Sequence, residues 1–152
     1  MTILQAALHY ASQGWRVFPL NGKTPFYGFA WKDLATTDSM TLAQWWSKWP
    51  NANVGLACGS GSGVWVVDID PRHGGDVSME ERTLEHGLYE PIAVSRTGGA
   101  DGGEHHFFAW NPDRPVGCPT KTMPGIDVKG EGGYVVLPPS IDPETGDPYE
   151  WR

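Results

Sequence analysis

Residues 64–71 read V-W-V-V-D-I-D-P, an apolar run that ends in two carboxylates and a proline. Five of its first six residues are apolar, and three of these are valines, which favour strands. The run therefore predicts a buried β-strand that the proline terminates. Alternate side chains of a strand share one face, so Asp68 and Asp70 should point the same way, about 6–7 Å apart along the chain.

Two carboxylates at the end of a buried strand repel each other and lose hydration. A bound divalent cation would remove both penalties, because hard cations such as Mg²⁺ prefer carboxylate oxygens. The alternative is a polar strand end whose aspartates hydrogen-bond the following turn. From this stretch alone, both interpretations of Asp68 and Asp70 stay open.

The composition predicts a globular chain of turns and short strands. Its 152 residues include 20 Gly and 13 Pro, too many for long helices throughout, and 39 % hydrophobic residues, enough for one sizeable core. We expect a single domain over residues 1–152, cut from the N-terminal part of a longer protein. The net charge of −7 argues against tight, nonspecific binding to duplex DNA.

Cysteine usage and hydropathy bear on the compartment. Cys58 and Cys118 form no C-x-x-C pair and indicate no disulfide scaffold, so a reducing cytoplasm is the simpler expectation. No apolar run approaches the ~20 residues of a membrane span, and the N-terminus lacks the features of a secretory signal. We expect a cytoplasmic protein without a membrane partner.

Periodicity and turn residues predict the order of elements. The segment 78–86 should begin with a capping box in which Ser78 is the N-cap and Glu81 the third helical residue. Residues 146–151 contain no obvious closing element. The expected helices are 2–13, 41–49 and 78–86, and the expected strands, besides the first, are 15–20, 54–58, 92–95, 104–110, 126–129 and 134–137.

Further candidate site residues lie on other predicted strands and loops. Asp127 is an acid in an otherwise apolar strand, and His105 follows two glycines that would let a ligand approach closely. The alternative for Asp127 is an exposed position at a strand edge, and the alternative for His105 is a purely structural role. Lys23 lies in a loop, where most lysines are simply solvated. Trp45 and Trp46 could stack on bases, although helical spacing favours core packing for at least one of them.

Several motifs occur in one order along the chain. They are G-W-R-V-F-P-L at 14–20, G-K-T-P at 22–25, P-N-A-N-V-G-L at 50–56, the D-I-D run, G-E-H at 103–105, the strand with Asp127, and G-G-Y-V-V-L-P-P-S at 132–140. This succession resembles the bifunctional primase–polymerase domain of the archaeo-eukaryotic primase superfamily, found in phage and plasmid replication proteins. The resemblance covers nearly the whole chain.

The resemblance implies an α+β fold in which a small N-terminal α/β unit packs on an RRM-like antiparallel or mixed sheet, with the active site in the cleft between them. It implies that Asp68, Asp70 and Asp127 bind catalytic Mg²⁺ or Mn²⁺ in a two-metal site. It also implies that His105 contacts the phosphates of the incoming nucleotide. Nearby cations that could hold the triphosphate are Lys23, Arg96 and Lys129.

The expected function is template-directed nucleotidyl transfer from nucleoside triphosphates to a 3′-hydroxyl, making or extending primers. The expected partners are a single-stranded DNA template, nucleoside triphosphates, and a helicase that is fused to the chain or acts in trans. Two alternatives remain at this point. One is a catalytically weak module that holds nucleotide or template, and the other is a metal-dependent phosphohydrolase that uses water as the nucleophile.

Overall fold

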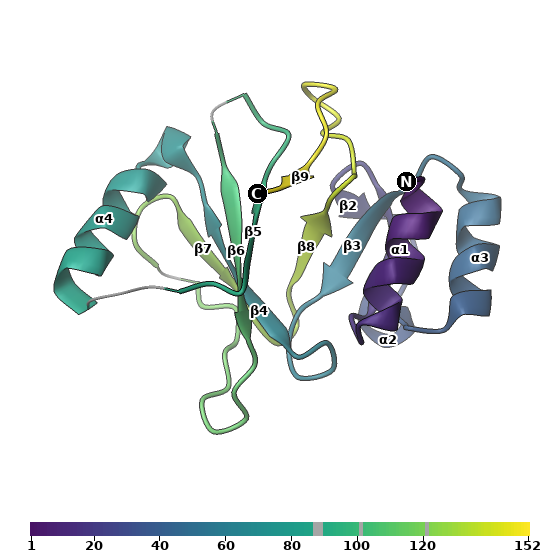
Figure 1. Cartoon of the computed structure of the whole chain (residues 1–152), viewed down its shortest axis with the longest axis horizontal. Helices are drawn as coiled ribbons and strands as arrows, with labels where there is room; N and C mark the ends of the chain where they lie inside the picture. Colours follow the sequence, from purple (N-terminus) through teal and green to yellow (C-terminus); the bar gives the residue numbers. More distant parts are fainter. Residues whose placement is uncertain (87–89, 101, 121) are drawn as a thin grey trace.

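The computed structural model describes residues 1–86, 90–100, 102–120 and 122–152. The fold is α+β, as the sequence predicted, and consists of two antiparallel sheets with helices on their outer sides (Figure 1). The four-stranded sheet has the order β2-β1-β3-β8, and the five-stranded sheet has the order β7-β4-β6-β5-β9. Every described strand pairing is antiparallel.

The helices and strands are interspersed along the chain. The helices are α1 (Ile3–Ser12), α2 (Trp31–Leu34), α3 (Ser39–Lys48), the 3₁₀ helix η1 (Pro71–His73) and α4 (Gly75–His86). The strands are β1 (Val17–Asn21), β2 (Thr24–Pro25), β3 (Asn53–Ala57), β4 (Val64–Ile69), β5 (Ala93–Arg96), β6 (Glu104–Ala109), β7 (Ile126–Lys129), β8 (Tyr134–Leu137) and β9 (Glu150–Trp151).

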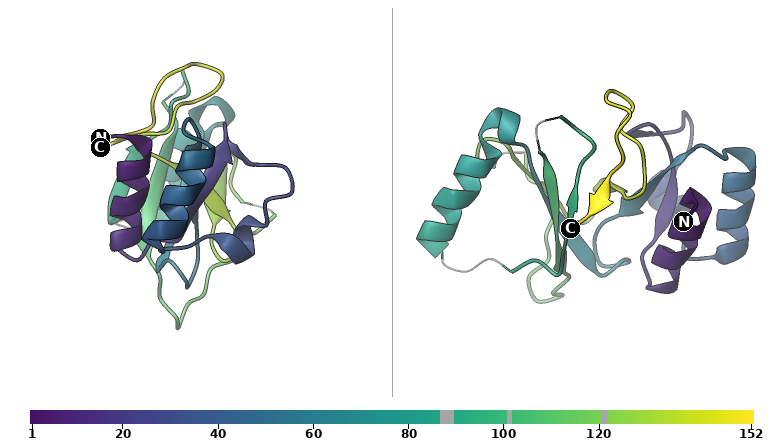
Figure 2. Two further views of the ribbon diagram at one scale, coloured as in Figure 1. Left: turned by 90° about the vertical axis from the view of Figure 1, so that its right-hand side faces the viewer. Right: turned by 45° about the horizontal axis from the view of Figure 1, so that its top comes forward.

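The predicted strand at residues 64–71 forms β4, which lies between β6 and β7 in the five-stranded sheet. Successive side chains of β4 point to opposite faces of the sheet, so they lie in two different environments. Val64 and Val66 point into the main hydrophobic core and are at most 2 % exposed. Trp65 stacks on Phe108 of β6, with ring centroids 4.6 Å apart, on the opposite face. Helix α4 covers that outer face (Figures 1 and 2).

The four-stranded sheet supplies the rest of the core. All five residues of β3 are buried, because α1 and α3 cover one face of the sheet and a second cluster fills the other. The main cluster extends across to the five-stranded sheet, where Phe107 of β6 is fully buried. Phe107 also stacks on Trp15, with ring centroids 5.6 Å apart. The two sheets therefore share one hydrophobic core.

The structure moves the start of two of the three predicted helices. Helix α1 begins after Thr2, which caps it through a capping box with Gln5. Helix α3 begins earlier than predicted because Asp38 caps it by accepting from the N–H of Thr41. The predicted capping box of Ser78 is wrong. Helix α4 begins at Gly75, and the Ser78 hydroxyl instead donates to the carbonyl of Pro124, 2.7 Å away.

The C-terminal segment closes the fold, contrary to the prediction that residues 146–151 contain no closing element. Strand β9 pairs with β5, and Trp151 reaches α1, where its Nε1 donates to the hydroxyl of Tyr10 at 2.9 Å. The first helix and the last strand therefore lie in contact (Figure 2). None of the described helices is long and apolar enough to cross a membrane.

Asn53 connects three distant parts of the chain. Its amide nitrogen donates to the carbonyls of Gly22 and Ile141, at 2.9 and 2.8 Å, and its amide oxygen accepts from the N–H of Ile141 at 3.0 Å. Because Asn53 is only 8 % exposed, water cannot readily replace these bonds.

We expect Asn53→Ala to lower the free energy of unfolding by about 2–3 kcal/mol, because it leaves buried backbone groups unpaired. Urea denaturation followed by circular dichroism measures this change. Asn51→Ala, at an exposed position two residues away, should change the free energy by less than about 0.5 kcal/mol. Equal losses in the two variants would contradict this account of Asn53.

Candidate active site

Asp68 lies where the inner face of β4 changes from core to solvent. It shares this face with Val64 and Val66, but its side chain is 36 % exposed and lines a pocket of about 380 Å³. The apolar residues before it are buried in the core. A carboxylate two residues further along therefore comes to the edge of that core, at the floor of the pocket.

The sheet register brings His105 and Asp127 to either side of Asp68. His105 of β6 and Asp127 of β7 are its direct partners across the two ladders. Directly opposite residues point to the same face, with Cβ atoms about 4.5–5.5 Å apart. Nε2 of His105 lies 3.5 Å from Oδ2 of Asp68. Three predicted site residues thus form one row across the sheet.

His105 is the buried member of this row. Its side chain is 6 % exposed, and its Nδ1 has no hydrogen-bond partner among the described residues. The hydroxyl of Ser95, directly opposite His105 on β5, is likewise buried and without a described partner. Buried polar atoms without partners are uncommon and destabilising. Such atoms beside a pocket indicate a place where a ligand or water oxygen would be accommodated.

Asp127 is the exposed member of the row. Its side chain is 53 % exposed and lies outside the wall of the pocket. Its Oδ2 pairs with Nζ of Lys129 at 2.9 Å, and Lys129 does line the pocket. Burial lowers the pKa of Lys129, but the hydrogen bond and charge of Asp127 outweigh this effect and raise it overall. Lys129 therefore stays charged beside the pocket.

Asp70 lies beyond the end of β4 and caps η1. Its Oδ1 accepts from the N–H of Arg72 at 2.9 Å, and its Oδ2 lies 2.8 Å from Nδ1 of His73. Burial raises the pKa of Asp70, but the hydrogen bonds from His73 and Arg72 hold it below its ordinary value. The turn-capping alternative therefore describes the contacts of this aspartate. Asp70 also lines the pocket, so capping does not remove it from the site.

The backbone at Asp70 is held between two glycines. The N–H of Asp70 donates to the carbonyl of Gly125 at 2.7 Å, and its carbonyl accepts from the N–H of Gly75 at 2.9 Å. A Cβ on Gly125 would lie 2.2 Å from the nitrogen of Gly75 and 2.5 Å from the oxygen of Asp70. Three backbone segments can meet this closely only because neither glycine has a side chain.

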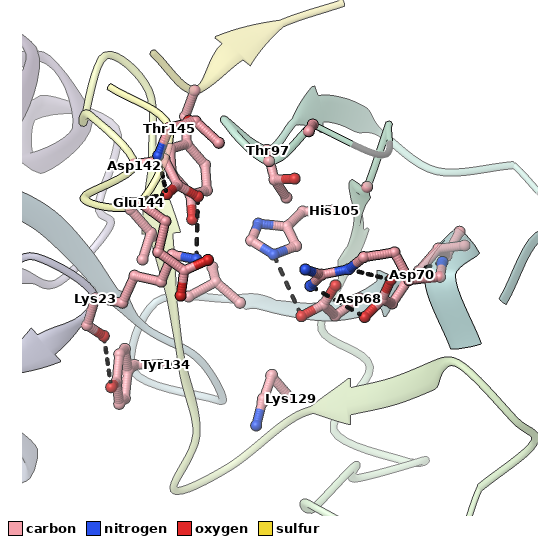
Figure 3. Close-up of a pocket in the computed structure, with 18 residues that line it drawn as sticks. Lys23, Asp68, Asp70, Thr97, His105, Lys129, Tyr134, Asp142, Glu144 and Thr145 are labelled. Carbon is pink, nitrogen blue, oxygen red and sulfur yellow. Dashed lines mark hydrogen bonds and ion pairs between the residues drawn. The ribbon is translucent and has the colours of Figure 1, made fainter. Parts of the chain in front are cut away.

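The other wall of the pocket comes from the four-stranded sheet and the C-terminal segment (Figure 3). Nζ of Lys23 lies 3.0 Å from Oδ2 of Asp142, which is 1 % exposed. The N–H groups of Glu144 and Thr145 donate to the other oxygen of this carboxylate. Burial raises the pKa of Asp142, but Lys23 and these N–H groups lower it overall.

Sequence reasoning identified Lys23 but missed Asp142. The two are separated by 119 positions, so no local spacing relates them. The available signal was the D-P-E-T-G segment at 142–146, which is typical of an Asx turn but not of a pocket wall. Thr145 extends this wall by donating to the carbonyl of Gly98 at 2.5 Å.

Arg96, the remaining predicted phosphate ligand, lies elsewhere. It pairs in register with Glu104 and Glu150, one position along from the row that contains His105. Adjacent residues of a strand point to opposite faces. Arg96 therefore belongs to the outer face of the sheet, and it does not line the pocket.

Residues 7–152 match the family described as bifunctional DNA primase/polymerase, N-terminal. The chain belongs to this family. The match includes both sheets and every residue of the row through Asp68. No curated protein matches the sequence.

For a member of the primase/polymerase family, the donor atoms at this site suit a hard divalent cation. Carboxylates are the ligands that Mg²⁺ and Mn²⁺ prefer, and Asp68, Asp70 and Asp127 supply three. In the described part of the chain, no three metal-ligating side chains are gathered closely enough to hold an ion. Each aspartate instead contacts a nearby basic side chain: His105, the Arg72–His73 pair or Lys129.

Substituting Gly125 tests the backbone clamp at Asp70. Gly125→Ala should lower the free energy of unfolding by at least about 2 kcal/mol more than Gly132→Ala does, as measured by urea denaturation. Both glycines have positive φ, +70° and +86°, so both substitutions carry the same backbone strain. Only a Cβ at Gly125 meets other backbone atoms, since Gly132 faces open space. Similar losses would show that the clamp tolerates a side chain.

Lys23→Met tests the ion pair on the opposite wall. A lowered folded-state pKa makes the Asp142 carboxylate stabilising above its unfolded pKa, near 3.9, and this contribution disappears as the pH falls through the folded value. We expect the variant to be about 1–3 kcal/mol less stable at pH 7, a figure reduced for the 40 % exposure of Lys23. The gap should narrow as the pH falls from 7 to 3.

Urea midpoints at pH 7 and pH 3 measure this gap. The matched control is Lys32→Met, at an exposed lysine whose Nζ lies over the ring of Trp31 and not beside Asp142. The control should show a small gap that does not close at low pH. A Lys23→Met gap that persists unchanged at pH 3 would contradict the assignment to Asp142.

Proposed function

We propose that the chain catalyses metal-dependent, template-directed nucleotidyl transfer, making or extending primers. The 3′-hydroxyl oxygen attacks the α-phosphorus of a nucleoside triphosphate. A new P–O bond forms, the bond to the β-phosphate oxygen breaks, and pyrophosphate leaves. The observation that carries the proposal is the row His105–Asp68–Asp127, which stands beside a pocket lined by Lys23 and Lys129 in a chain of the primase/polymerase family.

Asp68, Asp70 and Asp127 are the residues we assign to Mg²⁺ or Mn²⁺. When bound, a divalent metal neutralises charge on the phosphates and lowers the pKa of the attacking hydroxyl. The position of Asp68 supports its role most directly. Asp68 lines the pocket, and it lies directly opposite His105 on one neighbouring strand and Asp127 on the other. The basic partners of the three carboxylates offset their mutual repulsion until an ion binds.

The phosphates are assigned to His105, Lys23 and Lys129. Both lysines line the pocket, and each ammonium group is held by an aspartate, Asp142 or Asp127. This fixes two positive charges before the ligand arrives, so little reorganisation is needed on binding. His105 also lines the pocket, where an imidazole N–H can donate to a phosphate oxygen. Arg96 takes no part in this assignment, because it lies on the outer face.

The partners that fit this function are nucleoside triphosphates and a single-stranded DNA template. A helicase, fused to the chain or acting in trans, would supply that template in a cytoplasmic replication complex. The helicase rests on the family resemblance, and the compartment rests on the cysteine usage of the chain.

A second candidate is a nucleotide-holding module without efficient catalysis. The observation that favours it is the pairing of every candidate metal ligand with a basic side chain in the described structure. Such a module would bind nucleoside triphosphates in the same pocket but would not extend a primer.

Asp68→Asn should reduce primer extension on single-stranded DNA by at least about 100-fold, because a neutral amide is a much weaker metal ligand than a carboxylate. The assay uses Mg²⁺ and then Mn²⁺, with folding checked by circular dichroism. Asp113→Asn, at an exposed aspartate outside the pocket, should retain full activity.

The outcomes separate the candidates. Extension by the native chain that survives Asp68→Asn would refute the assigned role of Asp68. Nucleotide binding without extension by the native chain, with either metal, would support the holding module instead. Release of inorganic phosphate or nucleoside monophosphate without DNA would point to a phosphohydrolase.

A further inference from the structure

The charges of the chain are divided unequally between its two parts. Residues 1–66 contain four Lys or Arg and two Asp or Glu, whereas residues 67–152 contain seven and sixteen. The acidic net charge of the whole chain therefore belongs to its second part. The first part forms α1, α2, α3 and three of the four strands of the smaller sheet, and it carries a small positive excess. A polyanion would be attracted to this side of the molecule.

The same side has a cluster of partly exposed aromatic rings. Phe26 and Trp49 stack with ring centroids 4.5 Å apart and planes 15° from parallel. Phe29 lies edge-on to both Trp45 and Trp49. Trp46, in contrast, is 3 % exposed and packs in the core, which agrees with the prediction of core packing for at least one of Trp45 and Trp46.

Tyr27, next in the chain to Phe26, is fully exposed, with a relative accessibility of 107 %. The fold buries no part of this ring, so the ring contributes no burial energy to the folded state. It offers a flat surface on which another ring can stack.

A groove of about 310 Å³ runs beside this cluster, and we call it the aromatic groove. Its described lining contains no acidic side chain and includes Asn21, Gly22, Phe26, Lys48, Trp49 and Asn51. Nζ of Lys48 lies 4.5 Å from the centre of the Trp49 ring. A cation over an aromatic face, with amide groups beside it, combines the contacts that a base and its phosphate require.

The aromatic groove adjoins the candidate active site through a short turn. Asn21 and Gly22 line the groove, and the next residue, Lys23, lines the pocket that contains Asp68. A flexible chain that leaves this pocket past Lys23 therefore meets the groove within one or two residues of protein backbone. A nucleotide strand has the length and charge to contact both.

We propose that the aromatic groove, together with Tyr27, binds single-stranded nucleic acid. One base stacks on Tyr27, the next contacts the exposed part of Phe26, and Lys48, which lies over the Trp49 ring, contacts a phosphate. If the function proposed above is correct, the bound strand is the template that leads to the site around Asp68. The groove assignment itself depends only on the rings and charges described here.

The test measures binding of a fluorescein-labelled oligothymidylate of about 12 nucleotides, by fluorescence anisotropy at several salt concentrations. Chelator is present, and nucleoside triphosphates are absent. Tyr27→Ala should weaken binding by at least about five-fold. Tyr27→Phe should bind as tightly as the native chain, because the phenyl ring still stacks. Lys48→Gln should weaken binding and reduce the slope of log affinity against log salt by about 0.7, the value for one phosphate contact.

Two substitutions serve as matched controls. Met40→Ala removes an exposed apolar side chain from α3, and Arg114→Gln removes an exposed cation from the connection between β6 and β7. Both should bind as the native chain does. The proposal is overturned if the native chain fails to bind the oligonucleotide, or if the groove variants bind as tightly as the native chain. It is also overturned if the controls lose as much affinity as the groove variants.

This test is independent of catalysis. The binding assay contains chelator and no nucleoside triphosphate, so a chain without transferase activity still reports on the groove. Groove variants that bind normally, in a chain that extends primers, would refute the groove and leave the proposed function intact. A partner protein that competes for the groove, while these variants leave DNA binding unchanged, would assign the surface to protein contacts instead.

Discussion

Asp68 owes its position to the side-chain period of an antiparallel strand. Because this period is two, a shift of one residue along β4 would turn Val64, Val66 and Asp68 outward and bring Trp65 into the core. Two valines that are at most 2 % exposed make such a shift strongly unfavourable. The same register fixes His105 and Asp127 beside the aspartate. Burial of apolar side chains in one half of the strand thus determines the geometry of the polar half.

The electrostatics of the pocket follow from this arrangement. A sheet that places carboxylates on neighbouring strands must compensate their repulsion, and here each is matched by a basic group close to it in space. Under the proposed function, a metal bound to the carboxylates would leave these basic groups available for phosphate. The same pairing raises the pKa of Lys129, through Asp127, and lowers the pKa of Asp70, through His73 and Arg72.

Local chemistry could be predicted from the sequence, and long-range pairing could not. The strand at residues 64–71, the cap at Thr2 and the burial of Trp46 follow from propensity and spacing, which act over a few residues. The row through Asp68 followed from the motif order of the family. Asp142 was missed because its partner Lys23 is remote in sequence. The start of α4 was misplaced because Ser78 bonds Pro124, and no local signal reveals that contact.

The C-terminal segment explains why these remote contacts matter for the site. Residues 140–149 bond to Asn53 and Val54 in one sheet and, through Thr145, to the loop at Gly98 beside the other. The pocket wall around Asp142 therefore exists only when both sheets are already in place. The stability of a site assembled in this way depends on the whole fold. The strand that carries Asp68 follows from its local sequence. The pocket wall around Asp142, in contrast, depends on the contacts that the C-terminal segment makes with both sheets.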